Sequence, residues 1–399
     1  MAFTDRDFGI IENIGKHIEQ LLVSSDKQYF DIIENIEKHI KQLKPWVPSQ
    51  AIVGLGKYPI QILLNGSFID NVGDVFPLFI DKSSVDIANW SQSRLKPYNI
   101  LGLDTKKDTF LWFHVYHDFM KNDLLINRLK NKPLDNVRQA IVVASLWDGV
   151  GSSLFPLLCS QLRMLNINPV ALAVLPSKVQ PPDAHFNAFS SMGLHISTGS
   201  TPVLLIDRDR LENYVGVSRK GVKIEGNMIV NYLLELLLEK RTLGQEISEF
   251  SRSFNVNVFT ALLTTGASFR IYGSIENMLN TALLEPLLKF DLSSASVLYV
   301  LLRIPSHLKT KLPREKIDLS IANWVKNKFN LKSIYFSDPI YVEDTNDRID
   351  VVMFVGGFDV NGLFTSMEKK ISSIKDEAIN LGFISEKEWQ GISKSLIKD

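Results

Sequence analysis

QAIVVASLWDGVG, residues 139–151, is a run of apolar and β-branched residues that ends in a loop containing Asp148 and two glycines. The segment after it, LFPLLCSQL (154–162), has the pattern of an apolar helix with Cys159 at its centre. Apolar runs of this length, bounded by glycine and aspartate, are typical of buried parallel strands. The stretch therefore predicts a buried strand, a tight loop and a buried helix, and places Cys159 in the core.

Similar runs lie on both sides of this stretch. They are QAIVGLG (50–56), VFPLFID (75–81), NPVALAVLPS (168–177) and TPVLLIDRDRL (201–211). Because helical segments separate them, the order predicts an α/β fold with a doubly wound, mostly parallel, Rossmann-like sheet. Ligands of such sheets bind in loops at the carboxyl ends of the strands.

The second half of the chain has a different pattern. A long helical segment is expected at about 227–240, and a mixed region follows it. There, three strands are expected at 295–305, 332–342 and 348–359, with a helix at 317–329. The region reads as an α+β second domain, and the charged tail beyond it reads as helical, with Trp389 as an anchor to the body.

An internal repeat occupies the start of the chain. IIENIGKHIEQL (10–21) returns as IIENIEKHIKQL (32–43), with isoleucine and leucine at helical spacing in both copies. The repeat predicts two amphipathic helices that end before Pro45 and Pro48. They form either a hairpin packed on the body or an arm that binds a neighbouring subunit or another protein.

Composition excludes several classes of function. Lys+Arg and Asp+Glu both number 44, so no whole-protein basic field exists to hold nucleic acid or an anionic membrane. The single cysteine cannot form an intrachain disulfide, and the first residues carry no signal-peptide pattern, which favours a cytoplasmic location. No apolar stretch approaches the roughly 18–20 residues of a membrane span. His114, His117 and Asp118 lack further ligands at a recognisable spacing, so no metal site is expected.

Several strings, in the same order along the chain, resemble the tubulin/FtsZ superfamily. VLPSKVQPPDAHFNAFSSM (174–192) and LLIDRDRL (204–211) are similar to a tubulin segment, and Phe186-Asn187-Ala188 is its most specific part. TGASFRIYGS (265–274), LLEPLLKFDLSSASVLYVLLRI (283–304) and DVVMFVGGFD (350–359) resemble the FtsZ pattern. The resemblance covers most of residues 51–360. It implies a filament-forming GTPase fold that binds GTP or GDP with Mg²⁺.

The resemblance also implies a domain organisation. Together with the repeat and the pattern of the tail, it predicts a helical extension at 1–48, a nucleotide-binding domain at 49–226, a central helix at 227–245, an α+β second domain at 246–362 and a helical tail at 363–399.

The phosphate loop of the family is a glycine-rich turn between a strand and a helix, where consecutive backbone N–H groups approach the phosphates. At that position this chain reads Trp147-Asp148-Gly149-Val150-Gly151-Ser152-Ser153. A carboxylate about 4 Å from a phosphate, at an effective dielectric near 20, repels it by roughly 4 kcal/mol. Asp148 therefore opposes triphosphate binding unless Mg²⁺ bridges it or the loop turns it away.

The remaining nucleotide positions are only partly kept. If binding is retained, the resemblance assigns it to Gly54, Gly56, Gln61, Gly149, Val150, Gly151, Ser152, Asn187, Arg208 and Asn231. Arg208 stands where the family uses asparagine against guanine, and it cannot accept the hydrogen bonds that guanine N1 and N2 donate. The glycine-rich loop that covers the γ-phosphate is not recognisable between residues 101 and 114.

The catalytic loop also departs from the family. A gapless alignment places its asparagine and two aspartates at Arg252, Phe254 and Asn257, none of which can activate water as a carboxylate does. Glu246 and Glu249 lie upstream and would substitute only in a rebuilt loop. No catalytic residue is therefore predicted, and hydrolysis is expected to be absent or very slow.

Three readings follow from the resemblance. The first is a cytoskeletal protein that forms or joins filaments, with weak or absent GTP binding and defective hydrolysis, in a process such as cell division. The second is a non-polymerising adaptor or regulator of an FtsZ- or tubulin-type filament. The third is an active GTPase with remodelled loops. The expected partners are copies of the chain, head to tail, or a related filament protein.

Overall fold

The computed structural model describes residues 48–69, 74–92, 94–103, 105, 109–121, 124–198 and 201–397. The repeat expected at 10–43 lies outside the described residues, so its two readings stay predictions.

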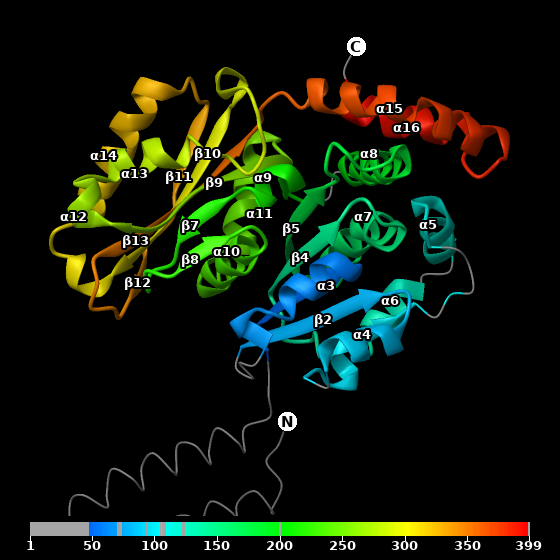
Figure 1. Cartoon of the computed structure of the whole chain (residues 1–399), viewed down its shortest axis with the longest axis horizontal. Coiled ribbons are helices and arrows are strands. Elements are labelled where there is room, and N and C mark those ends of the chain that lie inside the picture. Colours follow the sequence, from blue (N-terminus) through cyan, green and yellow to red (C-terminus); the bar gives the residue numbers. More distant parts are fainter. Residues whose placement is uncertain are drawn as a thin grey trace, which may run out of the picture. The chain divides into compact units, whose positions relative to one another are not determined.

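The described elements alternate between strands and helices in the first half of the chain (Figure 1). The strands are β1 (Gln50–Leu55), β2 (Val75–Asp81), β3 (Ile100–Gly102), β4 (Gln139–Ser145), β5 (Asn168–Leu175), β6 (Val203–Asp207), β7 (Val215–Val217), β8 (Lys223–Glu225), β9 (Val258–Ser268), β10 (Val297–Pro305), β11 (Ser333–Phe336), β12 (Ile340–Val342) and β13 (Arg348–Gly356).

The helices connect and cover these strands. They are α3 (Lys57–Leu63), α4 (Ser84–Ser91), α5 (Trp112–Lys121), α6 (Leu124–Leu129), α7 (Gly149–Met164), α8 (Pro182–Ser197), α9 (Arg208–Glu212), α10 (Met228–Glu239), α11 (Leu243–Phe254), α12 (Phe269–Tyr272), α13 (Ile275–Ala282), α14 (Arg314–Lys328), α15 (Asn361–Asn380) and α16 (Glu386–Leu396). Short 3-10 turns lie at Ser67–Ile69, Pro97–Asn99, Leu292–Ser294 and Ser306–Leu308. No described helix is long and apolar enough to cross a membrane.

Six strands of the first half form a parallel sheet in the order β6-β5-β4-β1-β2-β3. This order reverses direction at β1 and β4, which is the arrangement of a doubly wound fold. The strands read as continuous apolar runs because both faces of the sheet are covered by helices, and every residue of β1 and β4 is buried. The predicted α/β class and the five strands expected in this half are confirmed.

The second half adds antiparallel strands to the same sheet. β9 runs parallel to β6 through the pairs Val203↔Val258 and Leu204↔Phe259, β13 runs antiparallel to β9, and β10 antiparallel to β13. The described sheet is therefore continuous across eleven strands. The three strand segments predicted in this half are present, one of them divided into β11 and β12, and the helix expected at 317–329 is α14.

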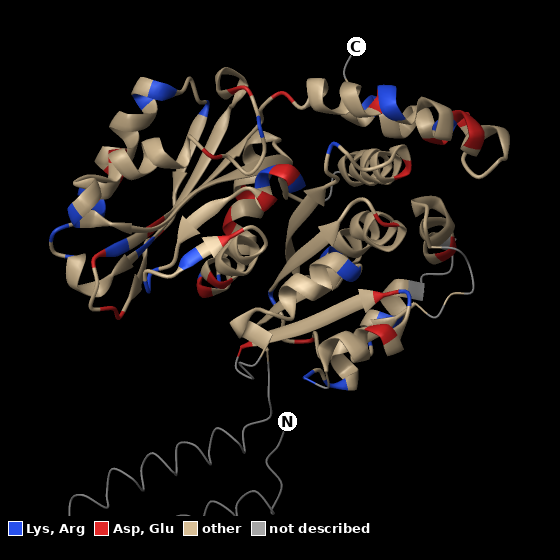
Figure 2. Cartoon of the chain, in the orientation of Figure 1, with Lys and Arg blue, Asp and Glu red and all other residues tan. Residues whose placement is uncertain are grey.

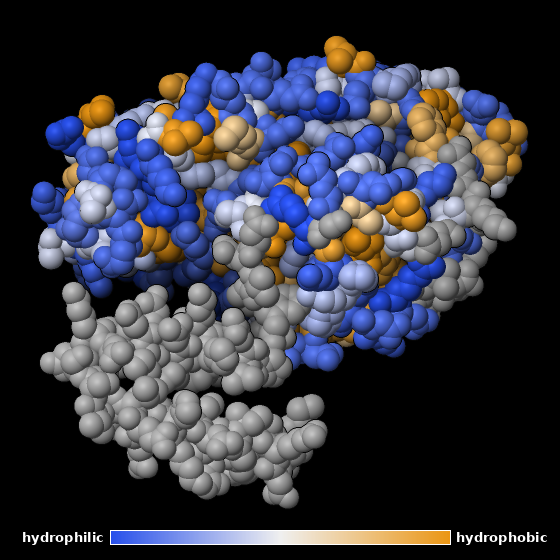
Figure 3. All heavy atoms as spheres, turned by 60° about the horizontal axis from the view of Figure 1, so that its bottom comes forward, coloured by the Kyte–Doolittle hydropathy of each residue, from blue (hydrophilic) through white to orange (hydrophobic). Residues whose placement is uncertain are grey.

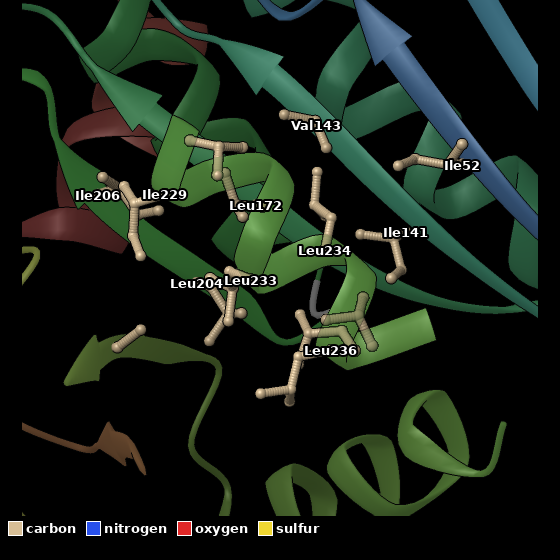
Figure 4. Packing of buried hydrophobic residues seen from close by; sticks show 14 of the residues in the cluster. Ile52, Ile141, Val143, Leu172, Leu204, Ile206, Ile229, Leu233, Leu234 and Leu236 are labelled. Atoms are coloured by element: carbon tan, nitrogen blue, oxygen red, sulfur yellow. The ribbon is translucent and has the colours of Figure 1, made fainter. Parts of the chain in front are cut away.

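The core on one face of the sheet is built around α10 (Figure 4). Ile229, Leu233 and Leu234 of this helix lie against apolar side chains of the parallel strands, among them Val143 and Leu172. Seven of the twelve residues of α10 are buried. Because the apolar face covers most of the helix, α10 is an interior support of the fold rather than a surface element.

The other face is covered by α7 and α8, and the C-terminal helices α15 and α16 lie on α8 (Figure 1). Trp389 stacks on Phe186 and Phe189, with ring centroids 5.8 and 5.2 Å apart, and His117 pairs with Glu388 at 2.8 Å. The predicted anchor of the tail is confirmed. Cys159 is 0% exposed in α7, and burial raises the pKa of its thiol, so the predicted core role is confirmed as well.

Candidate functional site

The loops after β1 and β4 lie side by side, because these strands are neighbours in the sheet. Gly56 alone joins β1 to α3, and residues 146–148 join β4 to α7. Gly56 has a φ of 84°, and a Cβ on it would lie 2.8 Å from both carboxylate oxygens of Asp148. The turn at Gly56 thus requires glycine, and Asp148 fills the space beside it.

Asp148 is the N-cap of α7, and its carboxylate turns back onto the first turn of that helix. Oδ1 accepts a hydrogen bond from the backbone N–H of Gly151 at 2.6 Å, and the hydroxyl of Ser145 donates to Oδ2. Helix N-termini bind anions because their unpaired N–H groups and the helix dipole favour negative charge. In this chain the anion at that position is a side chain of the protein.

The other residues of this loop are packed against the chain itself. A Cβ on Gly149 would lie 2.0 Å from the carbonyl oxygen of Thr109, and one on Gly151 would lie 2.1 Å from that of Ser145. Val150 is 4% exposed, and Ser152 is 0% exposed and donates to the carbonyl oxygen of Asp148 at 2.6 Å. These glycines are therefore needed for backbone packing whether or not a phosphate binds.

Burial raises the pKa of Asp148 to about 6, although hydrogen bonds from Ser145 and Gly151 oppose the shift. The nearby carboxylate of Asp81, at the end of β2, adds to the increase, and burial raises the pKa of Asp81 too. The carboxyl edge of the sheet therefore carries two carboxyl groups that hold protons more tightly than exposed ones.

The shift of Asp148 predicts a pH dependence of folding. Because the folded-state pKa lies above the ordinary value of 3.8, the protonated carboxyl stabilises the fold below pH 4, and this contribution is lost as pH rises through about 6. The difference between these two pKa values corresponds to about 3 kcal/mol of unfolding free energy. Asp148→Asn should remove this part of the profile, as measured by urea unfolding at several pH values.

The quantity to measure is the difference in unfolding free energy between the natural chain and Asp148→Asn, because a buried histidine changes stability with pH in the opposite direction. Burial lowers the pKa of His195 to about 4, so its contribution to stability is lost as pH falls from 6.5. His195 is the same in both proteins and cancels in the difference. A difference that is constant between pH 4 and 7 would show that Asp148 does not titrate in this range.

Arg208 lies against two aromatic rings beside Gly56 and Asp148, one from the first turn of α3 and one from the loop after β4. Its guanidinium is 5.3 Å from the ring centroid of Tyr58 and 4.9 Å from that of Trp147, and the two rings meet edge to face at 4.7 Å. Arg208 also pairs with Glu212 at 2.7 Å, and the Tyr58 hydroxyl donates to Asn227 at 2.5 Å. The residue expected at the base position is thus held by contacts within the protein.

Two asparagines from the predicted set have mainly structural contacts. Asn187 is 1% exposed, donates to the carbonyl oxygens of Phe110 and Trp147, and accepts from the backbone N–H of Trp112. Asn231 donates to the carbonyl oxygen of Ile62 at 2.8 Å, and its own side-chain oxygen has no described partner.

The structure therefore brings the predicted residues together at the carboxyl edge of the sheet, but most of them already contact other parts of the protein. Gln61 is exposed on α3, and Gly54 lies within β1, where a Cβ would meet Leu63 at 2.9 Å. The roles of Tyr58 and Trp147 were not predicted. Their signal in the sequence was an aromatic residue in each of the two segments, 54–61 and 147–153, where the family is rich in glycine.

The three positions aligned with the family's catalytic loop do not lie in one loop. Arg252 and Phe254 belong to the last turn of α11, and only Asn257 lies beyond the helix, directly before β9. The break between α10 and α11 falls earlier, at residues 240–242, because α10 ends at Glu239. The sequence predicted a central helix that runs to residue 245, whereas α10 ends at Glu239.

Two carboxylates follow this break directly. Burial opposes ionisation of Glu246, but hydrogen bonds from Thr242 and Tyr299 lower its pKa overall, and Lys240 pairs with it at 3.0 Å. Glu249 is exposed and accepts a hydrogen bond from Gln245 within the same helix. Glu246 is thus tied to the second half of the sheet, whereas Glu249 faces solvent.

A nucleotide at this edge of the sheet would meet protein groups that are already paired with one another. Its phosphates would compete with the Asp148 carboxylate for the N-terminus of α7, and its base would compete with the contacts of Arg208 to Tyr58 and Trp147.

Within the described part of the chain, no group of three or more His, Cys, Asp or Glu side chains could hold a metal ion.

Comparison with known proteins gives a likeness in structure only. No protein-family model matches the chain, and no curated protein matches it. CetZ from Methanosaeta thermophila strain DSM 6194 superposes with a TM-score of 0.64 at 16% identity, over 87% of this chain and 97% of that protein.

Two other solved structures agree over similar lengths. CetZ1 from Haloferax volcanii, a GDP-bound monomer, gives a TM-score of 0.62 at 16% identity over 82% of this chain and 99% of that one. TubZ from Bacillus thuringiensis serovar israelensis, a GTPγS-form protofilament, gives 0.55 at 13% identity over 87% and 97%. The arrangement of strands and helices in this chain is therefore shared along nearly the whole length of these proteins.

Proposed function

Since this chain has the tubulin/FtsZ fold, we propose that it is a cytoskeletal protein that forms or joins filaments while binding GTP weakly or not at all. Any hydrolysis of GTP is slow or absent. The partners are copies of the same chain or a related filament protein.

The contact of Asp148 with the N-terminus of α7 carries this proposal. The carboxylate accepts from Gly151 at 2.6 Å and fills the space beside Gly56, so the protein supplies the negative charge that a nucleotide phosphate supplies elsewhere. A loop held in place by its own anion needs no bound nucleotide to keep its shape. The contacts of Arg208 with Tyr58 and Trp147 support the same conclusion at the base position.

The proposed slow hydrolysis is explained by the nucleotide position, which Asp148 fills, and not by a lack of carboxylates after the α10–α11 break. Glu249 remains an exposed carboxylate after the α10–α11 break, so a group able to orient water is present. Such a group has no effect without a triphosphate held in the neighbouring site.

Assembly does not require hydrolysis. Head-to-tail contacts are heterologous and open-ended, so complementary surfaces are sufficient for a filament. Haloferax volcanii CetZ2, which is 17% identical and gives a TM-score of 0.60, was solved as a GTPγS-bound protofilament, as was TubZ. In this chain Lys, Arg, Asp and Glu are interspersed mainly over the helices and loops around both halves of the sheet (Figure 2), which suits contacts between copies better than binding to a polyanion.

The test is sedimentation of the purified full chain with GTP, with GDP and without nucleotide, followed by negative-stain microscopy of the pellet. We expect filaments in the same amount in all three samples, because the nucleotide position is occupied by the protein. Filaments that appear only with GTP would contradict nucleotide-independent assembly. A chain that stays soluble alone but pellets with a canonical FtsZ filament would favour the adaptor reading instead.

A further inference from the structure

Thr109 and Phe110, which precede α5, lie directly on the backbone that begins α7. A Cβ on Gly149 would lie 2.0 Å from the carbonyl oxygen of Thr109 and 2.8 Å from the carbonyl carbon of Phe110. Only glycine, which has no side chain, allows the two segments to approach so closely. Thr109 and Phe110 therefore form a lid on the first turn of α7, the helix whose N-terminus Asp148 caps.

The side chain of Asn187 in α8 joins this lid to the loop before α7. Its Nδ2 donates to the carbonyl oxygen of Phe110 at 2.9 Å and to that of Trp147 at 3.1 Å. Its Oδ1 accepts from the backbone N–H of Trp112 at 2.9 Å. One amide group thus uses both of its donors and its acceptor on backbone groups of two other segments, and it holds the lid and the loop at a fixed separation.

The hydrogen bonds of the lid are buried, although the lid itself faces solvent. Asn187 is 1% exposed, whereas Phe110 is 58% exposed. A segment whose largest side chain is mostly exposed gains little from burial of apolar surface. The closed position of the lid therefore depends largely on its hydrogen bonds, and segments of this kind open locally while the rest of the fold stays intact.

The chain that follows the lid is fixed by the C-terminal helices. Phe113 in the first turn of α5 stacks on Phe383, in the connection between α15 and α16, with ring centroids 5.0 Å apart. His117 pairs with Glu388 of α16 at 2.8 Å. Because α5 is held in this way along its length, opening involves the lid and not a displacement of the whole helix.

We propose that Thr109 and Phe110 are a lid that opens on the N-terminus of α7, and that Asn187 is the latch that keeps it closed. When the latch releases the Phe110 carbonyl, the first N–H groups of α7 become accessible to solvent and to the phosphate groups of a nucleotide. The lid is a second barrier beside Asp148, which accepts from one of these N–H groups. This inference rests on the proposed function, in which the protein itself fills the phosphate position.

Exchange of backbone amide hydrogens for deuterium, resolved by mass spectrometry of peptide fragments, tests the lid in three full-length proteins. They are the natural chain, Asn187→Ala and the control Asn231→Ala. Asn231 lies on α10 and donates to the carbonyl oxygen of Ile62 in α3 at 2.8 Å, so its variant loses a similar amide away from the lid. Exchange is measured without urea and in low urea, because local opening hardly depends on urea and global unfolding depends on it strongly.

In the natural chain we expect residues 149–151 to exchange faster than the buried strand β10, at a rate that low urea does not change. Asn187→Ala should accelerate this exchange by roughly tenfold or more, because it removes the three hydrogen bonds of the latch. Asn231→Ala should leave it unchanged. The first turn of α7 is the decisive reporter, since the Trp112 amide loses its acceptor in Asn187→Ala whatever the lid does.

Two results would overturn the proposal. One is a natural chain in which residues 149–151 exchange only through the urea-dependent unfolding that also exposes β10; this result needs no variant, so it stands even if Asn187→Ala does not fold. The other is exchange of residues 149–151 that is the same in Asn187→Ala and in the natural chain. The sedimentation test of filaments is a separate measurement, so the lid and the proposed function can fail independently.

Discussion

Replacing Asp350 with alanine is expected to lower the free energy of unfolding by about 3–5 kcal/mol. Asp350 is 0% exposed in β13 and accepts hydrogen bonds from the Arg303 guanidinium at 2.7 Å, the Gly266 backbone N–H at 2.7 Å and the Tyr232 hydroxyl at 2.8 Å. Arg303 is itself 2% exposed, so removal of the carboxylate leaves a buried cation with its main partner missing. Urea unfolding followed by circular dichroism measures the loss.

The position of this cluster explains the size of the effect. Tyr232 lies on α10, Gly266 on β9 and Arg303 on β10, and the Arg303 guanidinium also lies 5.0 Å from the Tyr232 ring centroid. One carboxylate therefore ties the central helix to three adjacent strands of the second half of the sheet.

Two control proteins separate the buried charge from ordinary surface effects. Asp318→Ala removes one partner of a partly exposed i,i+4 pair with Arg314 and should cost at most about 0.5 kcal/mol. Arg303→Met combined with Asp350→Leu should be less destabilised than Asp350→Ala, because the buried guanidinium is removed together with its buried carboxylate. If Asp350→Ala costs no more than Asp318→Ala, the cluster does not stabilise the fold as described.

The second prediction concerns nucleotide binding. Replacing Asp148 with glycine should raise the affinity for GTP with Mg²⁺ by up to about a thousandfold, because it removes a repulsion of roughly 4 kcal/mol and frees the N-terminus of α7. Calorimetric titration of nucleotide-stripped protein measures this change against the natural chain. Helix capping should suffer only slightly, since glycine is itself tolerated at an N-cap.

Asp148→Asn is the matched control for this variant, because it removes the charge and keeps the shape. If charge is the main obstacle, asparagine should recover most of the gain. If the side chain blocks the space beside Gly56, where a Cβ would already meet it at 2.8 Å, only glycine should succeed. Micromolar binding of GTP by the natural chain would contradict the account of a self-filled site.

The two mutations at this site also connect binding to assembly. Filaments of Asp148→Gly should respond to GTP if the freed helix N-terminus holds phosphate, whereas filaments of the natural chain should not.

The hydrophobic residues on the face shown in Figure 3 lie in separate small groups among hydrophilic ones, within the described residues. In the proposed filaments, contacts between copies on that face would use polar side chains as well as apolar ones.

Local patterns were sufficient to predict most of the strands and helices. Continuous apolar runs such as residues 139–145 and 168–175 give both position and parallel pairing, because a parallel strand is buried on both faces. The long strand β9, VFTALLTTGAS, was not predicted as a strand, since its threonines and glycine interrupt the apolar pattern. Its burial comes from the strands on either side, which are distant in sequence.

The sequence predicted where the candidate site lies in the fold but not how its side chains are arranged. Apolar runs within short segments indicated the sheet edge, and the resemblance to tubulin/FtsZ strings implied the position of the phosphate loop and the opposing charge of Asp148. Tertiary structure alone decided that Asp148 turns onto Gly151, that Arg208 lies against Tyr58 and Trp147, and that the helix break falls at residues 240–242. A side chain takes its direction from the partners that packing brings to it, and those partners come from strands and helices far away along the chain.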